Sequence, residues 1–382
     1  MRRVIILVLL ILSLLFASEN TAESFTLSQV APGPGSRSAH GMAFDPYNNV
    51  TVVYGGSSVG GGLNAVQDTW FYDYAANSWT EYTGASPPAR TNTAMVYCDA
   101  THEMILYGGQ GAADTWSFDC ESQIWTEVVT STNPGVRHSH ALAYDPIENV
   151  VILFGGFDEE GWDTDETWSF DCETREWTEL FPSEVPLARY GHVMTYDTNI
   201  SRIILSCGNT WSEGHQDDTW TFDVSANTWT EIDTIGDPNN LKWPSMVYDS
   251  INQKSILFGG QVGDNAVDAT QVYDAFTTRW ANPHPEQSPP ARINSGLAFD
   301  SMHGIVILYG GLLINEDDDL WIQMDDTWTY SYTENVWTEM TEITNEPAPT
   351  RTIVTILLLI GIPSVSIIAV VSIYLVRKRN RE

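Results

Sequence analysis

The stretch from Arg137 to Leu180 holds the pattern that determines the fold. It reads RHSHALAYDPIENVVILFGGFDEEGWDTDETWSFDCETREWTEL. Four strand-like runs, Ala141–Tyr144, Val150–Phe154, Glu166–Asp171 and Trp177–Leu180, are separated by an Asp-Pro pair, a Gly-Gly pair and acidic turn residues. Each run has the length of a β-strand and is too short for a helix. The stretch therefore predicts four short strands joined by turns.

The same pattern recurs in six copies that share one register. The double glycine recurs at Gly55-Gly56, Gly108-Gly109, Gly155-Gly156, Gly259-Gly260 and Gly310-Gly311, with Cys207-Gly208 in the fourth copy. Paired tryptophans close most copies, at Trp70/Trp79, Trp116/Trp125, Trp168/Trp177, Trp220/Trp229 and Trp328/Trp337, whereas the fifth copy has Gln271 and Trp280. Repetition at this period indicates a fold built from stacked, equivalent units.

These motifs resemble the kelch family, whose repeat is an apolar strand ending in Gly-Gly, a Tyr/Phe-Asp pair and a tryptophan. The resemblance implies an all-β fold, a six-bladed β-propeller with one four-stranded antiparallel blade per repeat. The expected repeats span residues 32–82, 83–128, 129–180, 181–232, 233–282 and 283–340, within a propeller of residues 24–340. Ser24–Val30 and the last tryptophan strand are alternative closing strands, and the sequence does not choose between them.

Elementary packing arguments support the same fold. A lone four-stranded sheet with two apolar faces cannot hide both from water, but blades stacked in a ring bury each face against a neighbour. Each tryptophan can bury about 150–250 Å² between blades. The Gly-Gly pair permits positive φ where the chain leaves the sheet. Structural roles are therefore expected for the glycines and for the paired tryptophans.

The two ends of the chain predict a membrane protein. Residues 1–18 carry Arg2, Arg3 and an apolar run, as a secretory signal peptide does. Residues 341–352 form an expected stalk, and residues 353–376 are apolar and uncharged, long enough for a transmembrane helix. The basic tail, residues 377–382, is expected in the cytoplasm, which places the propeller outside a single-pass type I protein of the plasma membrane.

Composition restricts the partners. The formal net charge is −33, which argues against nucleic-acid binding and favours cationic partners. The expected exterior location permits disulfides and glycosylation. The four cysteines are Cys98, Cys120, Cys172 and Cys207. They leave two possibilities, a Cys98–Cys120 pair on one blade or buried free thiols. Two N-glycosylation sequons begin at Asn49 and Asn199, both at expected hairpin turns.

Two sets of residues recur at the start of the innermost strands. The first is an arginine series of Arg37, Arg90, Arg137, Arg189 and Arg292, which blade 5 breaks with Leu241. Such a ring could grip an anionic ligand at the channel mouth or could bond neighbouring loops, and both roles remain open. The second set is His40, His140 and His192. A histidine inside an inner strand is expected to pair with a backbone carbonyl of the next blade, and metal binding is the less favoured role.

Acidic and aromatic residues cluster in the loops that follow Gly-Gly. The acidic set is Asp158, Glu159, Glu160, Asp163, Asp165, Glu166, Glu213, Asp217, Asp218, Glu316, Asp317, Asp318, Asp319, Asp325 and Asp326. Such oxygen ligands could hold Ca²⁺, although a solvated acidic rim is the other expectation and no EF-hand spacing occurs. Trp162, Trp211 and Trp321 lie in the same loops, outside the paired series. They are predicted to contact a partner.

These observations predict a surface-displayed module that binds a protein or glycan on its acidic, tryptophan-bearing rim. No nucleophile elbow, phosphate loop or zinc motif occurs, so an enzyme is not expected. Two alternatives remain: an enzyme acting on anionic sugars at the arginine-ringed mouth, and a passive envelope component without a specific ligand.

Overall fold

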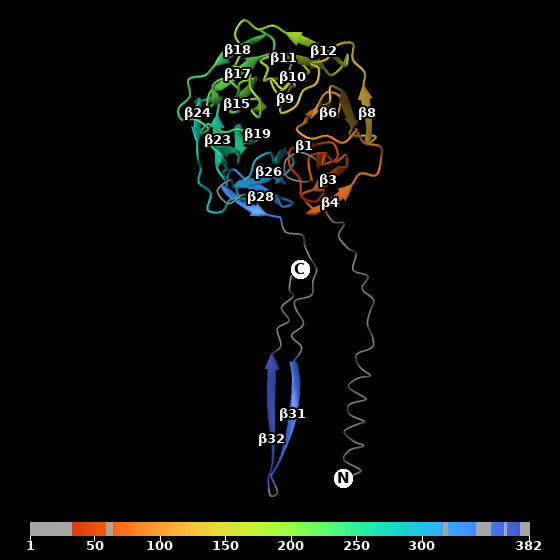
Figure 1. The fold of residues 1–382 in the computed structure, drawn as a ribbon, viewed down its shortest axis with the longest axis vertical. Helices are drawn as coiled ribbons and strands as arrows, with labels where there is room; N and C mark the ends of the chain where they lie inside the picture. The colour runs from red at the N-terminus through yellow and green to blue at the C-terminus, as the bar shows by residue number, and fades with distance from the viewer. Residues whose placement is uncertain (1–32, 59–63, 316–319, 341–352, 363–364, 375–382) are drawn as a thin grey trace. The chain divides into compact units, whose positions relative to one another are not determined.

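The computed structural model describes residues 33–58, 64–315, 320–340, 353–362 and 365–374. Within its first compact unit, Met1–Thr341, six four-stranded antiparallel sheets form a ring (Figure 1). We number these sheets blades 1 to 6 in chain order. The described residues of this unit contain strands and turns but no α-helix. The predicted all-β, six-bladed propeller is confirmed.

Each blade is built from one contiguous segment of the chain. Blade 1 contains β1 (Gly41–Asp45), β2 (Val50–Tyr54), β3 (Thr69–Asp73) and β4 (Ser78–Glu81). Blade 2 contains β5 (Ala94–Cys98), β6 (Glu103–Tyr107), β7 (Thr115–Asp119) and β8 (Ile124–Val128). Blade 3 contains β9 (Ala141–Asp145), β10 (Val150–Phe154), β11 (Thr167–Asp171) and β12 (Glu176–Leu180).

Blades 4 to 6 repeat this order and add a small two-stranded hairpin after the second strand. Blade 4 contains β13 (Val193–Asp197), β14 (Arg202–Ser206), β17 (Thr219–Asp223) and β18 (Thr228–Glu231), with the hairpin β15 (Asn209–Thr210) and β16 (Gly214–His215). Blade 5 contains β19 (Ser245–Asp249), β20 (Lys254–Phe258), β23 (Thr270–Asp274) and β24 (Arg279–Ala281), with β21 (Gln261–Val262) and β22 (Asn265–Ala266). Blade 6 contains β25 (Gly296–Asp300), β26 (Ile305–Tyr309), β29 (Thr327–Ser331) and β30 (Val336–Glu339), with β27 (Leu312–Asn315) and β28 (Leu320–Gln323).

The second strand of every blade carries a run of three or four apolar residues that are 0–1% exposed. In β10, the side chains from Val151 to Phe154 are fully buried. Both faces of this strand are covered, one by blade 2 and the other by blade 4, so Ile152 and Phe154 pack with Ile203 of blade 4. The hydrophobic core is therefore divided among the blade interfaces rather than gathered at one centre.

A ring of tryptophan–threonine hydrogen bonds joins the blades. The indole N–H of each fourth-strand tryptophan donates to the first threonine of the third strand in the preceding blade. The pairs are Trp125–Thr69 (3.0 Å), Trp177–Thr115 (2.9 Å), Trp229–Thr167 (3.1 Å), Trp280–Thr219 (2.9 Å), Trp337–Thr270 (2.9 Å) and Trp79–Thr327 (3.3 Å). The last pair joins blade 1 to blade 6, which lie side by side in Figure 1. The described blades therefore close without exchanging a strand, and Ser24–Val30 lies outside the described residues.

The Gly-Gly pairs lie where the backbones of two blades approach closely. Gly108 has φ = 61°, and a Cβ there would lie 2.4 Å from the Arg137 carbonyl oxygen of blade 3. The N–H of Gly109 donates to the same oxygen at 2.9 Å. A side chain at Gly108 would clash, and positive φ is costly for most residues, which explains the glycine. In blade 4, Cys207 occupies this position with φ = 67°.

The C-terminal segment differs from the sequence-based prediction. Residues 353–376 were expected to form one transmembrane helix, whereas Ile353–Ile362 (β31) and Val365–Tyr374 (β32) form an antiparallel pair of strands in the second unit, Glu342–Glu382. The helix prediction rested on length and apolarity alone, but six of ten residues in each strand are β-branched and favour a pleated surface. Among the described residues, none of the elements is a helix able to span a membrane. The predicted signal peptide (1–18), stalk (341–352) and basic tail (377–382) lie outside the described residues.

Candidate partner-binding face

The loops that join second to third strands form one end of the propeller, which we call the loop face. The turns that join the other consecutive strands of each blade form the opposite end, the turn face. At the loop face the channel narrows to a closed ring of six backbone hydrogen bonds, each N–H donating to the preceding blade's equivalent carbonyl. Its links are Ala39–Asn294 (2.8 Å), Asn92–Ala39 (2.9 Å), Ser139–Asn92 (3.0 Å), Gly191–Ser139 (2.9 Å), Trp243–Gly191 (2.8 Å) and Asn294–Trp243 (3.0 Å).

This backbone ring leaves only a small polar hollow at the loop face, with a volume of about 140 Å³. Towards the turn face the channel holds a larger space of about 570 Å³. Its walls are apolar, because the inner strands present a ring of methionines and leucines and a second ring of phenylalanines and tyrosines. The first ring is Met42, Met95, Leu142, Met194, Met246 and Leu297, and the second is Phe44, Tyr97, Tyr144, Tyr196, Tyr248 and Phe299. This part of the channel is therefore lined mainly by hydrophobic residues.

All five predicted arginines are buried inside their own blades, with side chains 0–3% exposed. Each forms an ion pair with an acidic residue just before the third strand. The pairs are Arg37–Asp68 (2.8 Å), Arg90–Asp114 (2.7 Å), Arg137–Glu166 (2.6 Å), Arg189–Asp218 (2.6 Å) and Arg292–Asp326 (2.6 Å). Of the two roles that the sequence left open, the geometry favours the structural one, because these guanidinium groups already have partners.

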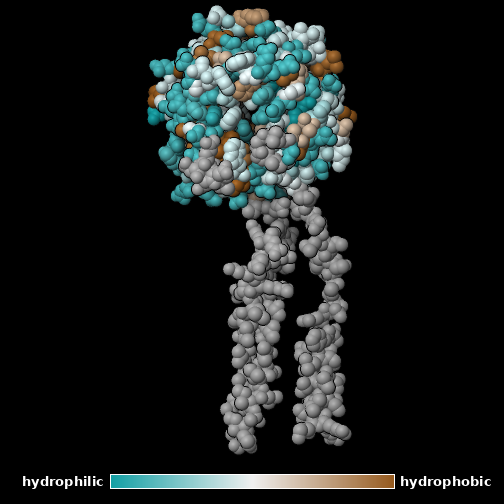
Figure 2. Space-filling model, in the orientation of Figure 1, coloured by the Kyte–Doolittle hydropathy of each residue, from teal (hydrophilic) through white to brown (hydrophobic). Residues whose placement is uncertain are grey.

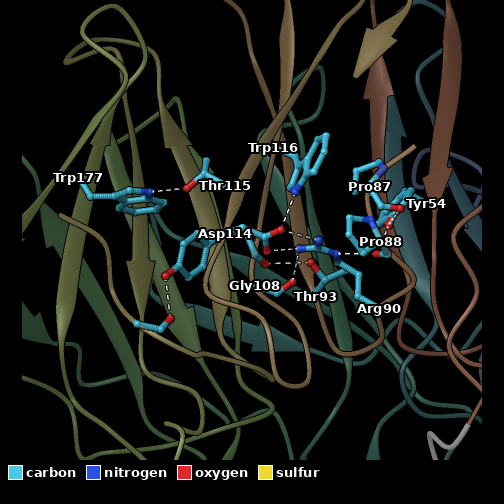
Figure 3. Close-up of polar contacts among 12 residues, drawn as sticks. Tyr54, Pro87, Pro88, Arg90, Thr93, Gly108, Asp114, Thr115, Trp116 and Trp177 are labelled. Atoms are coloured by element: carbon cyan, nitrogen blue, oxygen red, sulfur yellow. Dashed lines mark hydrogen bonds and ion pairs between the residues drawn. The ribbon is translucent and has the colours of Figure 1, made fainter. Parts of the chain in front are cut away.

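Blade 2 shows how completely one arginine is engaged (Figure 3). Arg90 donates to both carboxylate oxygens of Asp114, at 2.7 and 2.9 Å, and to the carbonyl oxygens of Gly108 (3.0 Å) and Pro88 (3.1 Å). The indole N–H of Trp116 donates to Asp114 at 2.7 Å. Burial opposes ionisation of Asp114, but the hydrogen bonds from Arg90 and Trp116 outweigh it, so the pKa of the carboxyl group lies below its usual value.

The three predicted histidines line the hollow at the loop face. Burial, reinforced by the charge of the nearby arginine, lowers the pKa of His40 and of His192 to about 3. Burial likewise holds the pKa of His140 well below its usual range. All three rings are therefore neutral at pH 7.

These histidines pack edge-on against aromatic rings of the preceding blade. His40 packs on Tyr309, His140 on Tyr107 and His192 on Phe154. The expected pairing with a carbonyl of the next blade is wrong for all three histidines, because their buried ring nitrogens make no such hydrogen bond. Aromatic packing replaces that bond because the preceding blade places a large ring beside each imidazole.

The predicted acidic loop residues are divided between internal contacts and exposed positions. Glu166, Asp218 and Asp326 are the partners of buried arginines. Asp158 caps its own loop by accepting the backbone N–H groups of Glu160 (2.9 Å) and Trp162 (2.8 Å). In the part of the chain that the structure describes, no group of three or more His, Cys, Asp or Glu side chains could hold a metal ion. Glu316–Asp319 lie outside it, and calcium binding stays a prediction.

Two of the three predicted tryptophans come together on the loop face. Trp162 and Trp211, from blades 3 and 4, meet edge to face with ring centroids 6.2 Å apart and remain 56% and 68% exposed. The backbone N–H of Trp211 donates to Asp163 at 2.8 Å, which fixes one loop against the other. Trp321 lies separately in β28 of blade 6 and is 49% exposed.

A second layer of aromatic residues lies nearer the channel on blades 3 to 5. The ring of Phe157 stacks on that of Tyr190 with centroids 4.1 Å apart, and the ring centroid of Tyr190 lies 6.1 Å from that of Trp243. Trp243 belongs to the backbone ring, and its indole occupies the space that a side chain at Gly191 would fill. We call Phe157, Trp162, Tyr190, Trp211 and Trp243 the aromatic patch.

A comparison with protein-family models matches the chain to a known repeat. The KLHDC2/KLHL20/DRC7 Kelch-repeats domain matches residues 12–184 and 146–359. The chain belongs to the kelch-repeat family. No curated protein matches it. Kelch propellers generally serve as protein-interaction modules and are typically non-catalytic.

Sequence reasoning identified the arginines of this kelch propeller but missed two of their partners, Asp68 and Asp114. The signal was present, because an acidic residue precedes the Thr-Trp pair in five of the six copies. In blade 5 the acid and the arginine are lost together, as Ala269 and Leu241. That joint loss could have shown that the two side chains pair.

The two predicted glycosylation sequons lie in different environments on the turn face. Asn199 is exposed. Asn49 has φ = 57° in its turn, and its side-chain oxygen is buried without a partner. Asn199 is therefore the more accessible acceptor. All four cysteines are buried free thiols, so the alternative Cys98–Cys120 disulfide is not formed.

Proposed function

We propose that this kelch propeller is a membrane-anchored surface module that binds a protein partner through the aromatic patch. The observation that carries the proposal is the exposed Trp162–Trp211 pair, held by Asp163 at the junction of two blades. Indole rings supply large contact areas at a low cost in conformational entropy, so tryptophans dominate many protein interfaces.

The surroundings of the patch favour a partner segment that carries positive charge. Glu159 and Glu160 are exposed beside Trp162, and Asp217 lies beyond Trp211 in the next loop. Lysine and arginine side chains combine favourably with indole faces and carboxylates, through cation–π contacts and ion pairs. On the propeller side seen in Figure 2, hydrophilic residues predominate and apolar ones are scattered among them. A small aromatic site in a charged surround therefore suits a selective contact better than broad hydrophobic docking.

The membrane location is part of the same proposal. It rests on the basic and apolar N-terminus and on the long apolar segment before Arg377 in the sequence. An epitope tag after Glu382 should be protected from protease in intact cells, whereas a tag after Ser24 should be cleaved. A protease-sensitive C-terminal tag in intact cells would refute the proposed orientation.

The binding proposal is tested with the purified full-length chain as bait for the solubilised envelope of its source cell. Trp162→Ala/Trp211→Ala should reduce retention of the partner by about 30-fold or more, as loss of an interface hot spot does. Phe276→Ala is the matched control, because Phe276 is 80% exposed but lies on the turn face. Proteins retained equally by the wild type and the tryptophan variant would exclude the aromatic patch.

The anionic-sugar enzyme is the weaker alternative, because the arginines proposed for it are buried and paired. A glycan ligand predicts that retention disappears when the envelope fraction is treated with glycosidases, while a protein ligand predicts that it persists. If the wild-type chain retains no envelope protein or glycan, the chain is better explained as a passive envelope component.

A further inference from the structure

Cys98 and Cys172 meet across the interface of blades 2 and 3. Cys98 ends β5 at the first turn of blade 2, and Cys172 follows β11 at the second turn of blade 3. Both lie in one buried cluster, close enough for each thiol to shift the pKa of the other. Asn149 ties them further, because its side-chain oxygen lies 3.8 Å from the Cys98 sulfur and its carbonyl accepts the Cys172 N–H at 3.3 Å.

The repeat shows that Cys98 replaces a different kind of residue. In the other five blades this turn position is an aspartate whose carboxylate accepts two backbone N–H groups of the turn. These aspartates are Asp45, Asp145, Asp197, Asp249 and Asp300. In blade 2 the thiol of Cys98 replaces this capping carboxylate. Among the described interfaces, the one between blades 2 and 3 alone has cysteine at both facing turn positions.

Cys120 provides the internal comparison. It occupies in blade 2 the position that Cys172 occupies in blade 3, and therefore faces the first turn of blade 1. There it meets Asp45 rather than a thiol, and Asn48 donates to its carbonyl oxygen at 2.6 Å. Cys207 lies elsewhere, at the close approach of blades 4 and 5. Cys98 and Cys172 thus face each other, whereas neither Cys120 nor Cys207 faces another cysteine.

We propose that Cys98 and Cys172, which are free thiols in this structure, are oxidised to a disulfide bond that joins blade 2 to blade 3. The bond is a covalent modification within the propeller and is separate from the proposed partner-binding patch. The oxidising exterior depends on the proposed surface location, but the juxtaposition of the thiols does not.

The chemistry is thiol–disulfide exchange with a small disulfide oxidant such as oxidised glutathione. The Cys98 thiolate attacks one sulfur of the oxidant, forms a mixed disulfide and releases one glutathione thiolate. Cys172 then loses its proton to solvent and attacks the Cys98 sulfur, which releases the second glutathione. The two cysteines lose two electrons and two protons, and the oxidant is reduced to two thiols.

The environment assigns the two cysteines different parts in this exchange. The interaction with Cys172, opposed by burial, holds the pKa of Cys98 below its usual value, so Cys98 is the first nucleophile. The interaction with Cys98, together with burial, raises the pKa of Cys172. Formation of the mixed disulfide removes the charge on Cys98 and with it part of the cause of that rise. Because both thiols are buried, exchange is expected while the blades dock during folding.

The experiment refolds the reduced full-length chain in a glutathione redox buffer, then blocks free thiols and maps the peptides by mass spectrometry without reduction. We expect one cross-linked pair, Cys98 with Cys172, and alkylated Cys120 and Cys207. The oxidised chain should melt roughly 5–10 °C above the reduced chain. Cys98→Ser should abolish this difference, and Cys120→Ser should keep it.

Alkylation of both Cys98 and Cys172 after refolding would overturn the proposal, and so would a cross-link of either residue to Cys120 or Cys207. The mapping uses the wild-type chain, so it remains decisive even if a serine variant fails to fold. Because the readout is a bond between two blades, it is independent of whether the aromatic patch binds a partner.

Discussion

The buried Arg90–Asp114 pair gives a quantitative test of what holds a blade together. Asp114→Ala would leave the Arg90 guanidinium, whose side chain is 2% exposed, without its carboxylate. Removing one partner of a buried pair typically costs 3–5 kcal/mol, because a charge stays buried and uncompensated. Asp114 is itself 28% exposed, so water can replace part of the lost contact, and we expect a cost of about 3 kcal/mol.

Blade 5 supplies the second half of this test. It has Leu241 and Ala269 at the two corresponding positions, so Arg90→Leu/Asp114→Ala copies a pair that the propeller already contains. The double variant removes the charge and the carboxylate together. Its cost in unfolding free energy should therefore fall about 2 kcal/mol short of the sum of the two single costs.

The free energies come from urea unfolding of the full-length chain, followed by tryptophan fluorescence and circular dichroism. Glu127→Ala is the matched control in blade 2, because Glu127 is exposed on β8, and its cost should stay within about 0.5 kcal/mol. Single costs that add to within about 0.5 kcal/mol would show that Arg90 and Asp114 do not stabilise the blade as a pair.

Three further predictions concern features that recur in several blades. The pKa of His40 and of His192 is about 3 in the folded chain, whereas an unfolded histidine has a pKa near 6.5. Between these two values the unfolded state binds more protons than the folded state. The stability that the neutral histidines contribute is therefore complete above pH 6.5 and is lost as pH falls towards 3. Each histidine should lower the free energy of unfolding by about 1.4 kcal/mol per pH unit in that window. His192→Gln should therefore make the unfolding free energy, measured in urea, depend less steeply on pH. An unchanged pH dependence would contradict the lowered pKa of His192. Gly108→Ala should destabilise the propeller by more than about 2 kcal/mol because its Cβ would meet the Arg137 carbonyl, whereas Gly111→Ala, with φ = 77° and no atom within 4 Å, should cost only about 1 kcal/mol; equal melting temperatures would exclude the clash. Trp125→Phe should cost about 1–3 kcal/mol through the lost hydrogen bond to Thr69 and the smaller ring, and a thermal melt identical to wild type would show that this inter-blade bond carries no net stability.

The fold was predictable because its determinants are local and repeated. Gly-Gly, the paired tryptophans and the apolar second strands each lie within one copy, and their common register sets the number of blades. Pairing between distant residues was harder to predict. Arg137 and Glu166 are separated by a long loop, and they were assigned to two different candidate sites, although they form one ion pair. The contact between Trp162 and Trp211 depends on the exit geometry of two loops from adjacent blades, which no spacing rule supplies.

The C-terminal segment illustrates a different limit. Its apolar length is compatible with a membrane helix, yet its β-branched content also suits strands, and a count of apolar residues cannot separate the two. Pairing of Ile353–Ile362 with Val365–Tyr374 reflects the second tendency.

The departures from the repeat point to the same face as the exposed tryptophans. Leu241, Ala269 and Gln271 replace the arginine, acid and tryptophan of the other blades, and all three lie in blade 5. Beside them, Trp243 enters the backbone ring where Gly191 leaves room for its indole. A repeat protein can accept substitutions at structural positions of one blade, because the interfaces between the other blades still close the ring. The inner edge of the aromatic patch thus lies in the blade that departs most from the repeat.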